Sequence, residues 1–173
     1  MARSLHQRLG RLLRHRLRDE RDTMRAIPAD LAARLAQRVA DSEKRHTGEI
    51  RVSVEASLPT SYVMRDATAR ERAIALFGKL RVWDTQDNNG VLIYLLLAEH
   101  AIEIVADRGV TARVPPGEWE RIVRGMGEAF RAGRYEKGLL RAIDEVTALL
   151  VQHFPARAGA ANPNELPDEP ALG

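Results

Sequence analysis

The spacing of hydrophobic residues predicts two helices before the first strand. In residues 1–25 the leucines fall on one arc at about 100° per residue and most arginines fall opposite, although Arg16 lies inside the apolar arc. A second helix is expected to begin at Pro28 and to end before Gly48. The apolar positions are Leu5, Leu9, Leu12, Leu13 and Leu17 in the first helix, and Leu31, Leu35 and Val39 in the second.

Three later segments read as strands. Residues 49–56 alternate between apolar and polar side chains, which predicts a strand with one face in water. Residues 91–97 are apolar on both faces, as in a central strand covered by helices on both sides. Residues 102–106 alternate again after a short turn at residues 98–100, so these last two strands should form an antiparallel hairpin. A helix joins the first two strands, which predicts a parallel, right-handed crossover.

The remaining helices and the tail complete the predicted fold. Asp66 is the expected N-cap of a helix that carries Ala73, Ile74, Phe77 and Leu80. Two further helices are lined by Trp119, Ile122, Val123, Met126 and Phe130, and by Tyr135, Leu139, Ile143, Val146 and Leu150. The sequence therefore predicts a basic amphipathic helix at residues 1–25 and an α/β domain at residues 26–154. This domain should have a small mixed sheet whose central strand is covered by helices on both sides. An extended tail should follow at residues 155–173.

Composition excludes several classes of site. The chain has 173 residues, of which 45% are hydrophobic and 29% charged, as in one globular domain. It has no cysteine, which rules out disulfides, thiolate nucleophiles and zinc or iron-sulfur sites that need a thiolate. No apolar run reaches the ~18 residues of a membrane span, and the N-terminal arginines lack the apolar stretch of a signal peptide. A cytoplasmic location is expected, with or without peripheral contact to the inner membrane.

The basic charge is concentrated at the N-terminal end. Residues 1–25 hold eight arginines against three acidic residues, a net +5, whereas the whole chain carries +3, so the remainder carries −2. The basic helix could dock its leucines on this domain or on a twin subunit, which would make a homo-oligomer. It could instead lie on an anionic membrane surface. Nucleic-acid binding is disfavoured because the segment has no aromatic residues that could stack on bases.

The predicted topology gathers oxygen-bearing side chains at one edge of the sheet. Glu49 begins the first strand, Asp84 and Asp87 precede the second, and the antiparallel third strand returns to Asp107 at the same edge. Carboxylate and amide oxygens are the ligands of Ca²⁺ and Mg²⁺. The sequence thus predicts a divalent-cation site formed by Asp84, Asp87, Asn88, Asn89 and Asp107. The alternative is that these are ordinary turn residues, since tight turns favour Asp, Asn and Gly.

Catalytic motifs are not found. The chain has no P-loop, HExxH or G-x-S-x-G motif. Arg108 could hold an anionic group over a metal at Asp107, although a solvated turn arginine is the simpler interpretation. Trp83 and Trp119 are expected in the core. The five histidines show no ligand spacing and are expected at the surface; they are His6, His15, His46, His100 and His153.

Four short motifs carry a family resemblance over about residues 28–154. They are Gly48-Glu49-Ile50, Asp87-Asn88-Asn89-Gly90-Val91-Leu92, Glu103-Ile104-Val105 and Phe130-x-x-Gly133-x-Tyr135-x-x-Gly138-Leu139. In order and spacing they resemble the TPM domain family, named after a thylakoid-lumen protein, a photosystem repair factor and a receptor modulator. Further motifs are similar to those of a short bacterial branch of that family: Arg70-Glu71-Arg72-Ala73, Val82-Trp83-Asp84-Thr85 and Asn164-Glu165-Leu166-Pro167-Asp168.

This resemblance implies a Rossmann-like three-layer α/β/α sandwich with a cleft at the acidic rim. It also implies calcium binding there and, by analogy with plant members, acid phosphatase activity. Asp84, Asp87, Asn88 and Asn89 match the acidic motif at the strand entry. Asp107 does not, because Ala106-Asp107-Arg108-Gly109 stands where the family usually has a glycine-rich turn.

Three functions are therefore expected. The leading one is a non-enzymatic accessory domain that binds Ca²⁺ or Mg²⁺ and presents a surface to a protein partner. The second is a metal-assisted phosphomonoesterase, in which ions held by Asp84, Asp87 and Asp107 activate water and Arg108 neutralises charge; Asp87, Asp107 and Arg108 would be its catalytic residues. The third is a peripheral membrane adaptor that binds lipid through residues 1–25.

Overall fold

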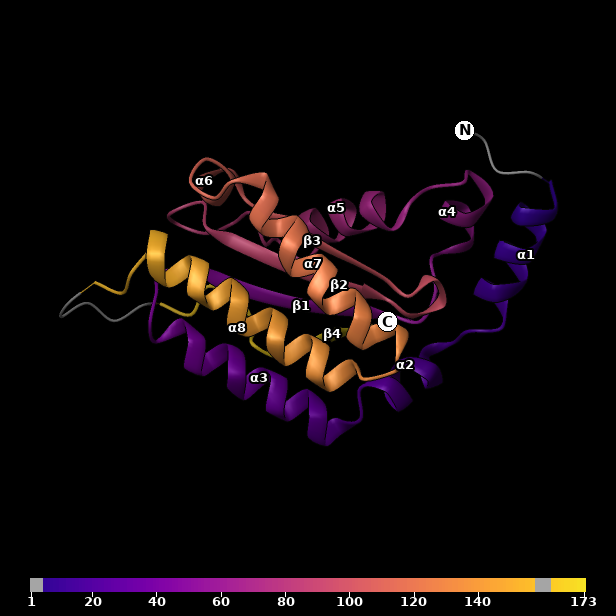
Figure 1. The fold of residues 1–173 in the computed structure, drawn as a ribbon, viewed down its shortest axis with the longest axis horizontal. Helices are drawn as coiled ribbons and strands as arrows, with labels where there is room; N and C mark the ends of the chain where they lie inside the picture. The colour runs from indigo at the N-terminus through magenta and orange to yellow at the C-terminus, as the bar shows by residue number, and fades with distance from the viewer. Residues whose placement is uncertain (1–4, 158–162) are drawn as a thin grey trace.

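The computed structural model describes residues 5–157 and 163–173. Helices and strands follow one another along these residues, and Figure 1 labels them. Their bounds, with η1 a 3₁₀ helix, are α1 (Leu5–Arg16), α2 (Glu20–Ala26), α3 (Ala29–Glu43), β1 (Glu49–Glu55), α4 (Thr60–Met64), α5 (Ala69–Lys79), β2 (Gly90–Leu96), η1 (Leu97–Glu99), β3 (Ala101–Ala106), α6 (Arg108–Thr111), α7 (Pro116–Arg131), α8 (Tyr135–His153) and β4 (Ala171–Leu172).

The sheet has four strands in the order β3-β2-β1-β4. Strands β1 and β2 are parallel, with Glu49 opposite Gly90, and β2 and β3 form the antiparallel hairpin, with Val91 opposite Ala106. The predicted mixed sheet with one crossover and one hairpin is confirmed. Strand β4 is an addition, because the end of the chain runs parallel to β1 and pairs Ala171 with Ser53.

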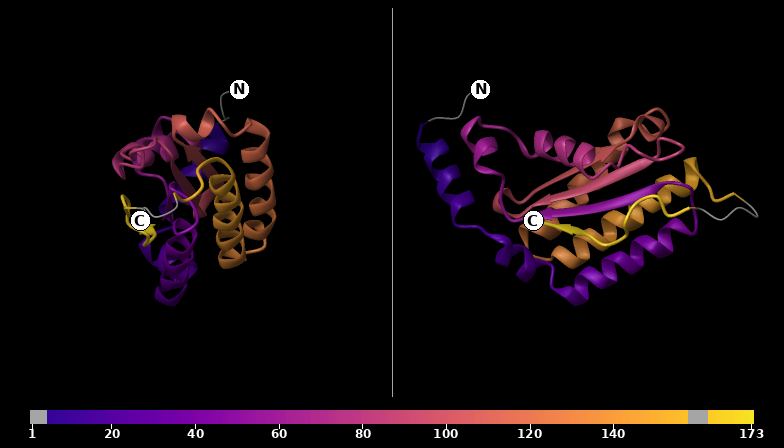
Figure 2. Two further views of the ribbon diagram at one scale, coloured as in Figure 1. Left: turned by 90° about the vertical axis from the view of Figure 1, so that its left-hand side faces the viewer. Right: turned by 180° about the vertical axis from the view of Figure 1, so that it is seen from behind.

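Helices cover both faces of this sheet, so the predicted three-layer sandwich is confirmed. Helices α3, α7 and α8 pack on one face, where the core includes Leu35, Ile93 and Val146. Helix α5 packs on the other face, against Tyr94 and its neighbours. Figure 2 shows this arrangement end-on at the left, and from behind at the right, where the C-terminal strand follows β1.

The predicted water-facing side of β1 is wrong, because all seven residues of the strand are buried. The C-terminal segment and α5 cover its polar face and supply hydrogen-bonding groups. Arg51 donates to the carbonyl oxygens of Pro167 and Glu169. The carboxylate of Glu55 accepts from Arg72 and from the Tyr94 hydroxyl, at 2.9 Å for the latter.

Two helix starts differ from the prediction. Residues 1–25 do not form one helix, because Asp19 caps a new helix, α2: its carboxylate accepts from the Arg21 amide, and Asp22 accepts from the Asp19 amide. Helix α5 begins after Thr68, which forms a capping box with Glu71. Asp66, the predicted N-cap, instead adopts a positive φ of 60° in the turn before it.

The predicted burial is wrong for three side chains, Trp83, His15 and His46. The Trp83 side chain is 51% exposed, whereas Trp119 packs half-buried against the core. His15 and His46 are buried, contrary to the expectation of surface histidines. His46 lies within hydrogen-bond distance of Ser42 and the Gly48 carbonyl, and burial lowers the pKa of its imidazole to about 4.

Candidate functional site

The chain reverses direction at His100, which adopts the left-handed conformation with a φ of 49°. Strand β3 then returns to the edge of the sheet where β1 and β2 begin. The Asp107 amide donates to the Gly90 carbonyl at 2.9 Å, and the Gly109 amide donates to the Asn88 carbonyl at 3.0 Å. The loop before β2 and the start of α6 therefore meet at one edge, as the hairpin topology predicts.

Two glycines allow this close approach. A Cβ atom on Gly90 would lie 2.0 Å from the Val82 carbonyl oxygen, and one on Gly109 would lie 2.5 Å from the Asn88 carbonyl oxygen. Neither distance is possible without moving the backbone. Glycine at both positions fixes the rim, meaning here residues 84–90 and 107–109, as one packed unit.

Arginine side chains interact with three of the five predicted cation ligands at this rim. Asp84 pairs with Arg81, Asp87 pairs with Arg157 at 2.7 Å, and the side-chain oxygen of Asn88 accepts from Arg108 at 3.0 Å. Among the residues that the structure describes, no group of three or more acidic or histidine side chains is arranged to hold a metal ion. The predicted five-residue site therefore stays a prediction.

Two oxygen atoms at the rim nevertheless lack a hydrogen-bond donor within the described residues. Asn89 is fully buried, and while its amide nitrogen donates to the Thr47 carbonyl at 2.9 Å, its Oδ1 has no partner. Asp107 accepts from the Arg108 amide through Oδ1, whereas its buried Oδ2 is unpartnered. Both residues adjoin Gly90, one along the chain and one through the ladder hydrogen bond. A buried oxygen without a hydrogen-bond donor can coordinate a cation or accept a hydrogen bond from a water molecule.

A buried pair of glutamates, Glu43 and Glu49, lies near the rim; the sequence analysis placed Glu49 at this edge but missed its burial and its neighbour Glu43. Glu49 is fully buried, and burial raises the pKa of its carboxyl to about 7. Burial, together with the charge of Glu49, raises the pKa of Glu43 to about 9. Their backbone donors are the amides of Leu166 and Ile50, at 3.2 and 2.9 Å. The alternating pattern assigned Glu49 to a water-facing side, and nothing local indicates that the C-terminal segment covers it.

Helix α1 docks through its polar side. Arg11 and His15 are each only 5% exposed, and both contact Oε1 of Glu99, at 2.6 and 2.9 Å. Arg11 also donates to the Ala67 carbonyl, and the Leu58 amide donates to Nδ1 of His15 at 3.0 Å. Burial opposes ionisation of Glu99, but hydrogen bonds from His15 and Arg11 outweigh it and lower the pKa of Glu99 to about 2.

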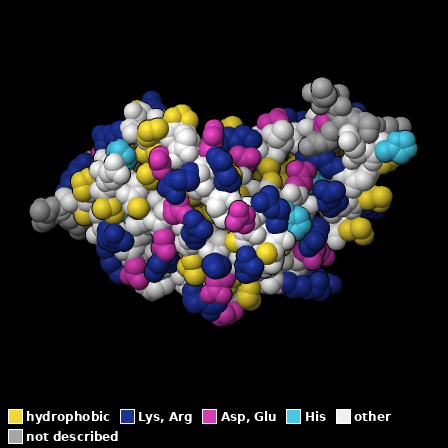
Figure 3. Space-filling model, viewed as in Figure 1, with side chains coloured by type: hydrophobic (Ala, Val, Ile, Leu, Met, Phe, Trp, Pro, Cys, Tyr) yellow, Lys and Arg dark blue, Asp and Glu magenta, His cyan; other side chains and the backbone are white. Residues whose placement is uncertain are grey.

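This orientation leaves leucines of the N-terminal segment exposed. Leu9 and Leu13 of α1, and Leu17 directly after it, are 53%, 61% and 79% exposed. Leu12 of α1 is half-buried and packs against the core. The prediction that the leucines dock on the domain is therefore wrong for these three. Figure 3 shows hydrophobic side chains next to arginines on the outer end of the molecule that α1 forms. None of the described helices has both the length and the apolar composition needed to span a bilayer.

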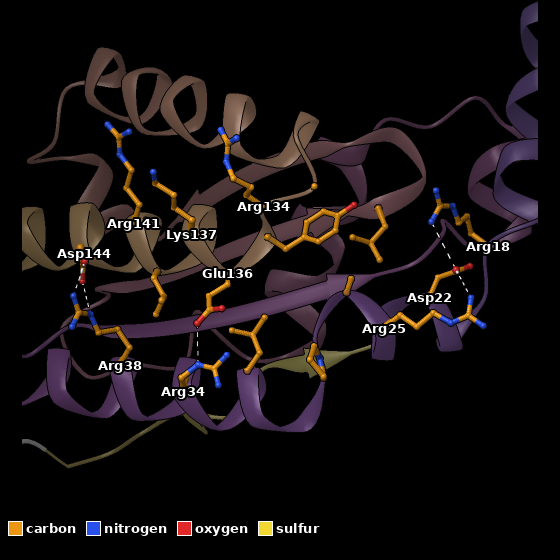
Figure 4. Close-up of a pocket in the computed structure, with 17 residues that line it drawn as sticks. Arg18, Asp22, Arg25, Arg34, Arg38, Arg134, Glu136, Lys137, Arg141 and Asp144 are labelled. Carbon is orange, nitrogen blue, oxygen red and sulfur yellow. Dashed lines mark hydrogen bonds and ion pairs between the residues drawn. The ribbon is translucent and has the colours of Figure 1, made fainter.

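A second surface feature is a groove of about 1120 Å³ between α2, α3 and the start of α8, drawn in Figure 4. Arginine and lysine side chains stand along its walls, and apolar side chains, including Leu31 and Leu140, line its floor. The sequence analysis did not find this groove, because its walls come from three helices whose packing the residue pattern does not specify.

Comparison with known proteins assigns this fold to a family. The TPM domain family model matches residues 21–149, which include strands β1 to β3, the rim and most of the residues that line the groove. Among curated proteins, no match is found.

Two solved structures are similar to the chain. One is the BA42 protein of the psychrophilic bacterium Bizionia argentinensis, with 26% identity and a TM-score of 0.74 over 85% of this chain and 95% of that one. The other is the N-terminal domain of a P. gingivalis protein, with 23% identity and a TM-score of 0.57 over 70% of this chain and 76% of that one. The resemblance seen in the sequence is thus confirmed: the chain belongs to the TPM domain family.

Proposed function

We propose that the protein is a peripheral adaptor that binds an anionic membrane surface through α1. One observation carries this proposal: α1 is attached by Arg11 and His15, whereas Leu9 and Leu13 of α1, and Leu17 directly after it, stay largely exposed. Large apolar side chains grouped on an exposed helix face are typical of an interaction surface.

The charge beside these leucines favours anionic lipid. Arg8, Arg14 and Arg16 are exposed on the same helix. Near an anionic leaflet each arginine contributes about 1 kcal/mol of attraction. The leucines would enter the boundary between headgroups and acyl chains, and the arginine side chains would extend to the phosphates. A two-fold pairing of α1 with a second copy would instead place these arginines near their own counterparts, which is unfavourable.

Vesicle sedimentation tests the proposal. The full chain should bind vesicles of phosphatidylglycerol and phosphatidylcholine more strongly than vesicles of phosphatidylcholine alone, and salt should weaken the binding. The triple variant Leu9→Gln/Leu13→Gln/Leu17→Gln should lose most of it. Ile74→Gln is the matched control, because Ile74 is 53% exposed on α5. If the triple variant binds as the parent does, or if neither vesicle binds, the proposal is wrong.

A divalent-cation site at the rim is the second candidate function, favoured by the unpartnered oxygens of Asn89 and Asp107. These two side chains, with rim carbonyls and water, supply the hard oxygen ligands that Ca²⁺ and Mg²⁺ select. An ion bound there would stiffen the rim of an accessory domain. The phosphatase alternative stays a prediction, and its Arg108 donates to Asn88.

Thermal melting in millimolar Ca²⁺ or Mg²⁺ tests this second candidate. An ion that binds only the folded state raises the melting temperature. Asp107→Asn should abolish the increase, whereas Asp84→Asn should keep it, because Asp84 is exposed and paired with Arg81. A melting temperature that does not respond to either ion would exclude the site.

A further inference from the structure

We infer that the groove between α2, α3 and α8 binds an acidic amphipathic helix of a partner protein. The inference goes beyond membrane binding, because the groove shares no residue with the exposed leucine face of α1. It rests on the shape of the groove, its apolar floor and the charge of its walls.

The size and floor of the groove suit a helix. Its volume of about 1120 Å³ exceeds that of most small-molecule sites, which are roughly 300–1,000 Å³. The floor is apolar, formed by Leu31 and Leu97 from the core and by the half-buried Tyr135 and Leu140. A hydrophobic floor between two helices is the geometry in which an amphipathic helix lays its apolar face.

The walls carry an excess of positive charge. Seven arginine and lysine side chains line the groove, against the carboxylates of Asp22, Glu136 and Asp144. Arg38 is paired with Asp144 and Arg34 with Glu136. Within the described residues, Arg134 and Lys137 form no ion pair, and both are exposed.

Three cations at the start of α8 form a row. Arg134, which is the N-cap of α8, is followed by Lys137 and Arg141 at three- and four-residue spacing, which places them along one side of the helix. Arg141 is paired with Glu145, so Arg134 and Lys137 are the two cations of the row that form no ion pair within the described residues. Figure 4 shows their side chains side by side along one wall, opposite Arg34 and Arg38 on α3. Carboxylates spaced on a bound helix would meet this row.

Other occupants fit less well. A planar bilayer would not reach the floor of a concave groove, and a small inorganic anion would leave the apolar floor exposed to water. An acidic helix with leucines on one side would cover the apolar floor with its leucines and place its carboxylates next to the basic walls.

Fluorescence anisotropy with a designed probe tests the inference on the full chain without lipid. The probe is a fluorescein-labelled peptide of leucine and glutamate, about 15 residues long so that it can form a helix, with leucines at positions i, i+3, i+4 and i+7. Two control peptides carry lysine in place of glutamate, or the same residues in an order that destroys the apolar face. We expect the probe to bind at least tenfold more tightly than either control.

Variants locate the binding. Arg134→Glu/Lys137→Glu should weaken the probe at least tenfold, and Leu140→Ala should weaken it without changing the charge. Arg45→Glu/Lys79→Glu is the matched control, because both residues are exposed, lie outside the groove and give the same change in charge. Circular dichroism of each variant confirms that it is folded.

Several outcomes would overturn the inference. One is that the probe binds no better than the control peptides. Another is that the probe binds the Arg134→Glu/Lys137→Glu variant as tightly as it binds the parent. A third outcome is that the probe does not bind, while the double variant loses vesicle binding or self-association. The groove would then bind lipid or a second copy of the chain instead. None of these results depends on whether α1 binds a membrane.

Discussion

The Nε atom of Arg108 donates to the side-chain oxygen of Asn88 at 3.0 Å, although the two residues are 20 positions apart. The contact exists because the hairpin returns the chain to the edge where β2 begins. This hydrogen bond links the two parts of the rim. The rim is therefore a packed structural unit, and any ligand must bind the oxygen atoms that do not take part in its internal hydrogen bonds.

Replacing Gly90 with alanine should destabilise this unit. The new Cβ would lie 2.0 Å from the Val82 carbonyl oxygen, so backbone must move. We expect a loss of about 2–3 kcal/mol in the free energy of unfolding, measured by urea denaturation. Gly78→Ala is the control: that helical glycine has open space around it and should gain about 0.5 kcal/mol. Equal stability of the two variants would contradict the described packing.

Glu99→Gln should release α1 from the domain. The substitution removes the carboxylate that faces both Arg11 and His15 and leaves the buried Arg11 with Asp66 as its remaining acidic partner, which weakens the compensation of a buried charge. We expect faster tryptic cleavage after Arg14 in a folded domain. Glu118→Gln, which breaks an exposed pair with Arg121, should leave the cleavage rate unchanged. Equal rates in both variants would show that Glu99 does not hold α1.

Stability should fall as the pH rises from about 5 to 9. The folded state raises the pKa of Glu49 to about 7 and that of Glu43 to about 9, so over this range it binds more protons than the unfolded chain. Burying either carboxylate in its charged form is unfavourable, and the free energy of unfolding must therefore decrease with pH. His46, whose pKa is lowered to about 4, acts in the opposite sense, between pH 4 and 6.5.

Glu49→Gln isolates one part of this effect. Between pH 5 and 9 the parent should lose about 2 kcal/mol or more, roughly 5 °C in melting temperature, and the variant should lose less. Glu118→Gln is the control, because the Glu118 side chain is 42% exposed, whereas Glu49 is fully buried. If the melting temperatures of the parent and the Glu49→Gln variant depend on pH in the same way, the raised pKa of Glu49 is wrong.

Arg72→Met should destabilise the protein more than the loss of a surface ion pair would. Arg72 and Glu55 are 14% and 11% exposed, and the Glu55 carboxylate also accepts from Tyr94. Removing Arg72 leaves a buried charge unpaired, at a cost of about 3 kcal/mol. The double variant Glu55→Gln/Arg72→Met should recover part of this loss in chemical denaturation. Additive effects of the two substitutions would mean that the pair is not coupled.

Most of the domain could be predicted from short-range patterns. The alternation in residues 49–56, the doubly apolar run at residues 91–97 and the short turn at residues 98–100 predicted the parallel crossover and the hairpin correctly. Those elements also brought Asp107 to the edge where Asn88 and Asn89 lie. What the pattern could not provide was the partner of each polar side chain. Asp87, for example, pairs with Arg157, 70 positions away.

The N-terminal helix shows where sequence and tertiary structure divide. The sequence by itself determined that this segment is basic, and it predicted which residues share a helix face, because helix geometry alone sets that spacing. Only the tertiary structure decided which face docks, because Glu99 lies 88 positions from Arg11 in the sequence and its carboxylate contacts both Arg11 and His15. In the same way, the tertiary structure decided that the polar face of β1 is buried, because the end of the chain returns to cover it.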